Sequence, residues 1–189
     1  VTVVENGILK TFLFSRTPIE GFPESNGHGR RQPGAEVVAR QSNLIVESRK
    51  GVPEARLREM LMEEVKRQGK PYGLYFEDIT GGFTFTQRAG LQAFRVIPRV
   101  VYRVYADGRP DELIRGANIV GTPLAAFAKI IATSDSAGVF NGYCGAESGR
   151  VPVAAISPAL LVSEIEIEKK QTSQQRPPFL PAPSLGEKN

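Results

Sequence analysis

The alternation of apolar and polar residues predicts a chain richer in strand than in helix. Apolar or alternating runs of strand length recur along it, as half-buried strands require. These runs cover 8–14, 35–47, 72–79, 83–87, 96–105, 112–120, 151–155 and 159–167. Residues 15–34 hold many prolines and glycines, so we expect irregular structure there.

Three local signals indicate how the strands are joined. Thr80-Gly81-Gly82 predicts a turn between the two strands that flank it. Asp107-Gly108 is the strongest hairpin signal in the sequence and predicts an antiparallel return. Pro98 lacks a backbone donor, so its strand is expected to lie at a sheet edge or to contain a bulge.

Two segments have the period of an amphipathic helix. The first begins at Pro53 and ends at Gly69, and the second has Thr122 as N-cap and Pro123 in its first turn. The apolar stripes that these helices would bury are Leu57, Met60, Leu61 and Val65 in the first and Leu124, Phe127, Ile130 and Ile131 in the second.

Many strands, hairpin turns and two main helices together predict an α+β fold. We expect one mostly antiparallel, β-rich domain over residues 1–168, with twisted sheets or a barrel-like arrangement. Residues 169–189 lack periodicity and are rich in proline, which predicts an extended or disordered tail.

Composition narrows the function classes. The chain of 189 residues is 41% hydrophobic and 23% charged, which is typical of a globular protein. No apolar run is long enough for a membrane span, so we expect no membrane partner. The net charge of +4 invites nucleic-acid binding, but the basic residues are interleaved with acids and no basic arm occurs. We therefore expect no nucleic-acid partner and keep that function as the weakest alternative.

The start of the chain carries an expectation of its own. It begins at Val1, and both methionines, Met60 and Met62, are internal. We expect a C-terminal piece of a longer polypeptide, so part of an active site could lie upstream.

The single cysteine is the residue most suggestive of chemistry. Cys144 lies in Phe140–Gly149, between Gly142 and Gly145, and we expect these glycines to form a sharp turn. One cysteine excludes an intramolecular disulfide. Cys144 is then a small buried apolar group, a reactive thiol or a metal ligand, and the residues alone leave all three open.

Other catalytic patterns are absent from the sequence. His28 is the one histidine, so a metal site with two histidines cannot be completed within this chain. The chain has no Gly-x-Ser-x-Gly elbow and no phosphate loop. A Cys144–His28 dyad is conceivable, but no signature supports it.

Five segments taken in order resemble the C-terminal domain of the TldD/PmbA family, once labelled modulators of DNA gyrase and now regarded as peptidases. They extend over nearly the whole chain except the tail. These segments are Gly7–Arg16, Ser25–Arg30, Ile79–Phe83, Leu113–Thr122, and Cys144-Gly145 together with Arg150–Val153 and Ser157–Leu161.

The resemblance implies that the chain is the second half of a zinc metallopeptidase. In members of the TldD type, a His-Glu-x-x-x-His motif in the preceding domain supplies two zinc ligands and the general base. The position matching Cys144 supplies the third ligand, which leaves the fourth position open for water. A cysteine there places the chain nearer the TldD side. The zinc would belong to the full-length protein, and the piece alone would be inactive.

The resemblance also implies partners and a substrate. These are the N-terminal domain of the same protein, a second copy or a TldE/PmbA-like subunit, and unfolded peptides in the cytoplasm. Substrate-backbone contacts are expected at Asn26, Gly27, Gly29 and Arg30, whereas His28 departs from the family's loop pattern and is not a ligand. The alternative is a non-catalytic interaction or scaffold domain of the same fold, with Cys144 merely buried.

Overall fold

The structure is a computed structural model that describes residues 1–85, 90 and 92–170. The chain divides into two compact units. The first unit combines Val1–Glu64 with Ile130–Ser163, and the second combines Val65–Lys129 with the chain from Glu164 onward. The described part is mostly antiparallel sheet with two helices, so the predicted α+β class is confirmed. That residues 1–168 act as one domain stays a prediction.

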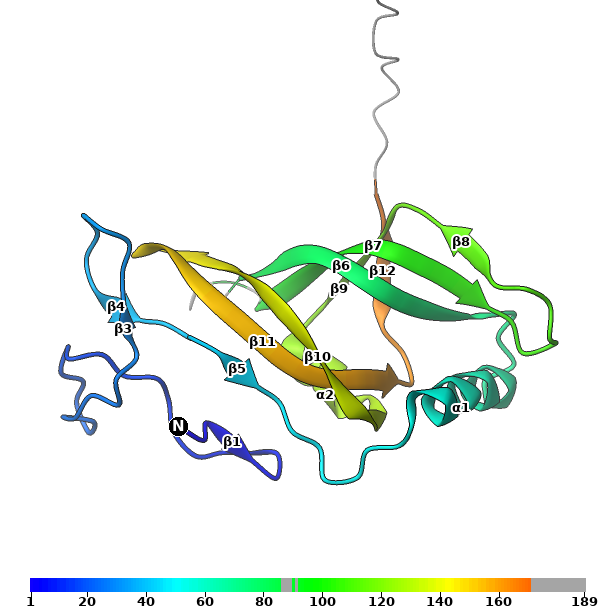
Figure 1. Cartoon of the computed structure of the whole chain (residues 1–189), viewed down its shortest axis with the longest axis horizontal. Coiled ribbons are helices and arrows are strands. Elements are labelled where there is room, and N and C mark those ends of the chain that lie inside the picture. Colours follow the sequence, from blue (N-terminus) through cyan, green and yellow to red (C-terminus); the bar gives the residue numbers. More distant parts are fainter. Residues whose placement is uncertain (86–89, 91, 171–189) are drawn as a thin grey trace, which may run out of the picture. The chain divides into compact units, whose positions relative to one another are not determined.

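A long hairpin dominates the first unit. Strand β10 (Ile130–Ala146) pairs antiparallel with β11 (Gly149–Val162) across a tight turn at Glu147 and Ser148. Strand β5 (Leu44–Ile45) adds to β11 in parallel. Figure 1 shows β5 along one side of this hairpin.

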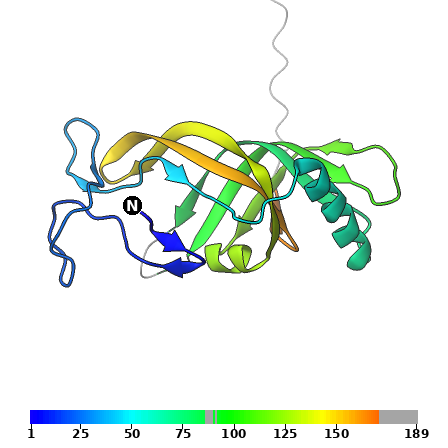
Figure 2. The same cartoon turned by 60° about the horizontal axis from the view of Figure 1, so that its bottom comes forward.

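Two short pairs of strands complete the first unit. Strands β1 (Val4–Glu5) and β2 (Ile8–Leu9) form one antiparallel pair, visible near the N-terminus in Figure 2. Strands β3 (Gly29–Arg30) and β4 (Val38–Ala39) form the other. Of the predicted run 8–14, the two residues of β2 are strand and the rest is irregular. Of the predicted run 35–47, the two residues of β4 and the two of β5 are strand and the rest is irregular.

The prediction of two separate strands at 151–155 and 159–167 is wrong. Strand β11 continues through Pro158, which pairs with Ala137 where the register of the hairpin shifts. The buried Ser134 supplies a hydrogen bond at this irregularity, because its Oγ accepts the N–H of Ala159 at 2.7 Å. A side-chain hydroxyl thus replaces a carbonyl of the strand ladder.

The segment before the first helix pairs with β10 at the same irregularity, next to Ser134. Val52 forms an isolated parallel bridge with Ser134, and its N–H and C=O both bond to β10 at 2.9 Å. A side chain at Gly51 would meet the Ser134 carbonyl oxygen at 2.5 Å, so the approach requires glycine. Helix α1 (Glu54–Arg67) then begins just after Pro53, as predicted.

Helix α1 buries the apolar stripe only in part. Leu57 and Val65 are buried, whereas Met60 and Leu61 are half-buried. The chain leaves the helix through Gly69, which has φ +61° and ends the helix as expected.

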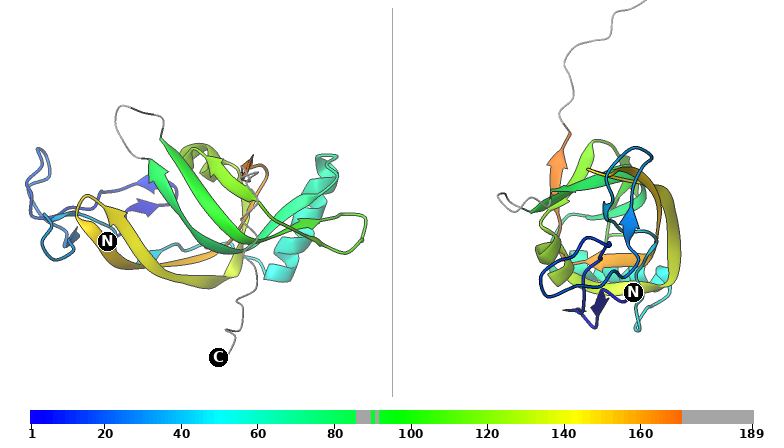
Figure 3. Two further views of the ribbon diagram at one scale, coloured as in Figure 1. Left: turned by 90° about the horizontal axis from the view of Figure 1, so that it is seen from above. Right: turned by 90° about the vertical axis from the view of Figure 1, so that its left-hand side faces the viewer.

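The second unit is one sheet of five strands. They are β6 (Gly73–Phe85), β7 (Ala93–Val104), β8 (Glu112–Ile114), β9 (Ala117–Gly121) and β12 (Glu166–Lys169). Their order is β12-β9-β7-β6, and β8 also pairs with β7. Figure 3 shows β6 and β7 side by side over most of their length.

The predicted turn at Thr80–Gly82 is wrong, because β6 runs straight through it. The register against β7 is irregular from Phe76 to Gly81. Gly82 is needed for a different reason, since a Cβ there would collide with the carbonyl oxygen of Arg95 on β7. Gly82 thus allows close approach of the two strands within a distorted ladder.

Pro98 lies in the irregular part of this ladder, which confirms the predicted bulge and excludes the edge position. Strand β7 has β6 on one side and both β8 and β9 on the other. Pro98 lies between the residues that pair with β9 and those that pair with β8. Pro98 has no N–H to donate, and on the side of β8 and β9 this part of β7 has no strand partner that would need one.

The predicted hairpin at Asp107-Gly108 is confirmed. Tyr105–Asp111 joins β7 to β8, with Gly108 at φ +85°. The return strand 112–120 is broken at Gly116, which has φ +79°, so that it forms β8 and then β9.

The second helix is shorter than predicted. Helix α2 (Pro123–Ala128) has Thr122 at its N-cap, but Ile130 and Ile131 belong to β10. Leu124 and Phe127 are 84% and 64% exposed, so the predicted buried stripe is wrong for the described structure. Since the helix ends before a second full turn, it buries none of its own side chains.

Lys169, the first residue of the predicted tail, is the last residue of β12. Residues 171–189 of the predicted tail lie outside the described residues, as do residues 86 and 87 of the predicted run 83–87. Neither described helix is long and apolar enough to cross a membrane.

We expect Gly51→Ala to lower the free energy of unfolding by about 1–3 kcal/mol, because its Cβ collides with the backbone of β10. Gly138→Ala, in the same unit, is the control, since its Cβ would have no neighbour closer than 4.0 Å. Urea denaturation followed by circular dichroism measures both. Equal stability of the two variants would contradict the docking of Gly51 and Val52 onto β10.

The turn between β7 and β8 contains an ion pair of Asp107 with Arg109, and the pKa of Asp107 can be measured by titration. Arg109 donates to both carboxylate oxygens of Asp107 and lowers the pKa of Asp107 from 3.8 to about 2. Because the folded pKa lies below the unfolded one, this pair stabilises the fold above about pH 4, and its contribution is lost as the pH falls towards 2. Both side chains are exposed, so salt will weaken the effect.

We expect Arg109→Gln to return the pKa of Asp107 towards 3.8 in a titration followed by carboxyl NMR. Arg99→Gln, elsewhere on β7, is the control and should leave it near 2. An unchanged Asp107 titration in the Arg109 variant would show that another group lowers its pKa.

Candidate functional site

Cys144 lies within strand β10, and its place in the ladder corrects the sequence prediction. The expected sharp turn between Gly142 and Gly145 is wrong, because both glycines pair across the hairpin. The chain turns three residues later, and Gly149 takes the left-handed conformation there with φ +87°. Cys144 is half-buried, so its thiol is held on a strand close to the hairpin tip.

Arg40 holds this hairpin tip. Its side chain is buried, with 5% of the residue exposed. One terminal nitrogen donates to Ser148 Oγ at 2.7 Å and to the Gly149 carbonyl at 3.0 Å, and the other donates to the Cys144 carbonyl at 2.5 Å. The guanidinium therefore joins the two strands of the hairpin on either side of the turn.

All three acceptors of Arg40 are uncharged. Within the described ranges no carboxylate forms an ion pair with this guanidinium. Arginines such as Arg56 and Arg109, by contrast, are exposed and bond to carboxylates. Arg40 is thus a buried cation stabilised by neutral oxygens alone.

The loop at residues 25–30 is folded by its own side chains. Asn26 accepts the Phe14 N–H at 2.7 Å and donates to the Phe12 carbonyl at 2.8 Å, so its amide imitates a neighbouring strand. Arg30 donates to the carbonyls of Gly27 and Gly29 at 2.7 and 2.9 Å. The loop is therefore held both by hydrogen bonds within it and by hydrogen bonds to Phe12 and Phe14.

Two of the predicted contact residues are glycines with different surroundings. Gly29 needs its small size, because a Cβ there would stand 3.0 Å from Val37 Cγ1. Gly27 has φ +81° and open space where a Cβ would be. Gly27 is exposed, but its N–H donates to Ser25 Oγ at 3.1 Å and its carbonyl accepts from Arg30, so both of its backbone groups have partners within the loop.

A continuous series of hydrogen bonds connects this loop to Cys144. The His28 N–H donates to Phe14, and the Arg40 N–H donates to the His28 carbonyl at 2.9 Å. The Arg40 side chain then reaches Cys144, which is 104 positions away in the sequence. The fold thereby brings together two segments that stand out separately in the sequence, and β3–β4 lies at the hairpin tip in Figure 1.

Gln32 makes a second connection to the hairpin tip. Its N–H donates to the Ser148 carbonyl at 2.8 Å, and its Oε1 accepts the Arg150 N–H at 3.1 Å. Gln32, Arg40 and Ser148 were not among the residues expected from the sequence to form a site. No local signal marks them, since Arg40 looks like one more surface charge in an extended segment.

The described residues do not form a complete metal site on their own. Within residues 1–85, 90 and 92–170, no three His, Cys, Asp or Glu residues gather as a metal centre would require. His28 Nδ1 lies 2.9 Å from Asn26 Oδ1, so this ring nitrogen is engaged within the loop. Cys144 is a half-buried soft donor on a paired strand, and a metal bound there would need further ligands from beyond the described residues.

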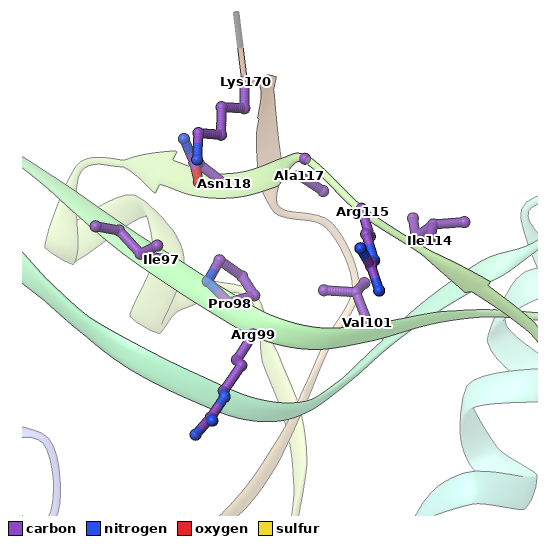
Figure 4. Close-up of a pocket in the computed structure, with 10 residues that line it drawn as sticks. Ile97, Pro98, Arg99, Val101, Ile114, Arg115, Ala117, Asn118 and Lys170 are labelled. Atoms are coloured by element: carbon purple, nitrogen blue, oxygen red, sulfur yellow. The ribbon is translucent and has the colours of Figure 1, made fainter. Parts of the chain in front are cut away.

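The second unit contains a cleft of about 190 Å³ beside Pro98, where β7 lacks a partner. Figure 4 shows cationic side chains and apolar side chains around it. They are Arg99, Arg115 and Lys170, with Ile97, Pro98, Val101 and Ile114. Its lining holds no His, Cys, Asp or Glu, so it lacks the side chains that usually bind a metal.

Comparison with known proteins finds a matching family model and a curated relative. The family model described as "PmbA/TldA metallopeptidase C-terminal domain" matches residues 1–169. The protein named Metalloprotease MJ0996, from Methanocaldococcus jannaschii, is 28% identical over 152 residues. This alignment covers 80% of the present chain and 31% of the relative, so the chain spans about a third of that relative's length.

The geometry of the hairpin tip predicts different responses from two neighbouring glycines. In Gly149→Ala, the left-handed backbone is strained and the new Cβ stands 2.5 Å from Gln32 Cβ. We expect a loss of about 1–3 kcal/mol in the free energy of unfolding. Gly145→Ala is the matched control, because nothing lies within 4 Å of its Cβ. If chemical denaturation finds both variants equally stable, the contact between Gln32 and the tip is not formed in solution.

Proposed function

We propose that this chain, which belongs to the PmbA/TldA metallopeptidase C-terminal domain family, supplies one ligand of the catalytic metal in a larger peptidase. The ligand is the thiolate of Cys144, and the metal is zinc. The observation that carries the proposal is that Arg40 holds the hairpin tip of the half-buried Cys144 and connects it by hydrogen bonds to the loop at residues 25–30.

The rest of the site would come from a preceding domain of the same polypeptide. The described residues form no group of three candidate ligands, so by this proposal two histidines and a glutamate base come from that domain. The metal, once bound, supplies Lewis acidity that polarises the scissile carbonyl and lowers the pKa of the attacking water. The chain without that domain is inactive by this proposal.

Within this chain, each named residue has a limited task. Cys144 donates electrons from its sulfur, and the strand ladder keeps it in place. Asn26 and Gly29 shape the loop through their contacts with Phe14 and Val37. Gly27 and Arg30 remain the contacts proposed for the substrate backbone. Gly27 is exposed, and a bound peptide would replace its hydrogen bonds to Ser25 and Arg30.

The substrate class and assembly extend this proposal. We infer unfolded peptides as substrates, because backbone groups at a glycine can pair with any extended chain irrespective of its side chains. The presence of Cys144 favours the TldD side of the family, working in the cytoplasm as a homodimer or with a TldE/PmbA-like partner. The name of the archaeal relative, a metalloprotease, is consistent with this activity.

The competing function is a scaffold domain in which Cys144 is only a packing residue. The two functions differ in what replacement of the thiol does. Cys144→Ser preserves size while replacing a soft donor with a poor one. The scaffold function predicts no change in metal content.

We expect Cys144→Ser in the full-length parent protein to lose its stoichiometric zinc and its cleavage of casein-like peptides. The loss in metal affinity should exceed the roughly 10–100-fold that removing a hydrogen-bond partner of a ligand costs. Val139→Thr, an exposed substitution on the same strand, is the control and should retain both properties. Zinc content by atomic spectrometry and a peptide-cleavage assay measure the outcome; unchanged zinc and activity in Cys144→Ser would establish the scaffold function instead.

A further inference from the structure

The positive charge of Arg40 is buried among uncharged acceptors. Burying a guanidinium removes its hydration, and three neutral oxygens repay this less well than a carboxylate does. Neutral side chains could bond to the same oxygens at a lower desolvation cost. The hairpin tip therefore has a cation where stability alone does not call for one.

The guanidinium fixes the directions of its hydrogen bonds. Its donors form a rigid, planar fork, unlike the single point charge of a lysine. Two of its hydrogen bonds reach Ser148 and Gly149 after the turn, while a third reaches the Cys144 carbonyl before it. The peptide of Cys144 is thereby held at a set position relative to the opposite strand.

A metal ligand needs this kind of restraint. Zinc–sulfur bonds are about 2.3 Å long, and a site tolerates deviations of about 0.2 Å. Cys144 lies three residues from the turn of a hairpin whose tip contacts the rest of the first unit through Gln32 and Arg40. Of these two residues, Arg40 is the one that contacts Cys144 itself.

We propose that Arg40 is a positioning residue that orients Cys144 for metal binding. This inference rests on the proposed function and adds to it a residue outside the ligand set. Gln32 docks the same hairpin tip through Arg150, without a bond to Cys144, so it contributes to the fold and leaves the ligand unaffected.

The test uses the full-length parent protein loaded with Co²⁺ in place of zinc. A thiolate bound to Co²⁺ gives a charge-transfer absorption band in the near ultraviolet, so the spectrum reports the Cys144 ligand directly. Three variants are compared with the parent: Arg40→Lys, which keeps the charge but loses the fork, Gln32→Ala as the matched control, and Cys144→Ser.

We expect Arg40→Lys to weaken metal affinity by about 10–100-fold and to diminish the thiolate band. Gln32→Ala should leave the affinity and the band unchanged, even if it lowers the unfolding temperature. Should Arg40→Lys fail to fold, Ser148→Ala removes one acceptor of the same fork and should change the band in the same direction by a smaller amount.

The outcomes separate the two proposals. Loss of the band in Cys144→Ser together with a normal band and affinity in Arg40→Lys and Ser148→Ala would overturn the positioning role and leave the proposed function intact. An unchanged band in Cys144→Ser would overturn the proposed function, and the role of Arg40 with it. Equal effects of Gln32→Ala and Arg40→Lys on metal affinity would reduce Arg40 to a structural contact.

Discussion

The antiparallel pairing of β10 with β11 is the interaction on which the first unit depends. Its register places Cys144 opposite Val151 and places the turn at Glu147 and Ser148. A shift of one residue would send every side chain of a strand to the other face. The same register aligns the carbonyls of Cys144 and Gly149 with the guanidinium of Arg40.

The contacts around the hairpin tip show how a site can be built from segments with little regular structure. Residues 10–50 form only short strands, yet Asn26, Gln32 and Arg40 each replace part of a strand ladder with side-chain hydrogen bonds. Such contacts are directional, so they hold a loop in place with less buried apolar surface than a packed helix needs. Arg40 adds charge to this arrangement, which strengthens its hydrogen bonds to the neutral carbonyls.

Local backbone chemistry could be predicted from the sequence, and contacts between distant segments could not. Pro53 and Gly69 bounded a helix correctly, and Asp107-Gly108 correctly indicated a hairpin, because these signals act within a few residues. Gly82 and Pro158 were interpreted as breaks between strands, although both lie inside continuous strands. Their role is set by the opposite strand, through the carbonyl of Arg95 in one case and the bulge at Ser134 in the other.

The candidate site likewise combines residues that the sequence indicates with a contact that it does not. Cys144 stands out in the sequence by its chemistry, and the loop at residues 25–30 stands out by a family resemblance. Their connection through Arg40 could not be predicted, because no property of residues 35–47 distinguishes an arginine that will be buried from one that will be hydrated.

The first unit is assembled from two stretches of chain, Val1–Glu64 and Ile130–Ser163, with the second unit's Val65–Lys129 between them. During synthesis from the N-terminus, Arg40 leaves the ribosome about a hundred residues before its acceptors exist. At about 5–20 residues per second, the early segment waits roughly 5–20 seconds with its guanidinium in water. The sheet of the second unit must wait as well for its last strand, β12, which follows Ser163. The first unit cannot be completed until β6 to β9 of the second have been made, and the second cannot be completed until β10 and β11 have been made. A chain released before β10 would therefore expose unpaired edges in both.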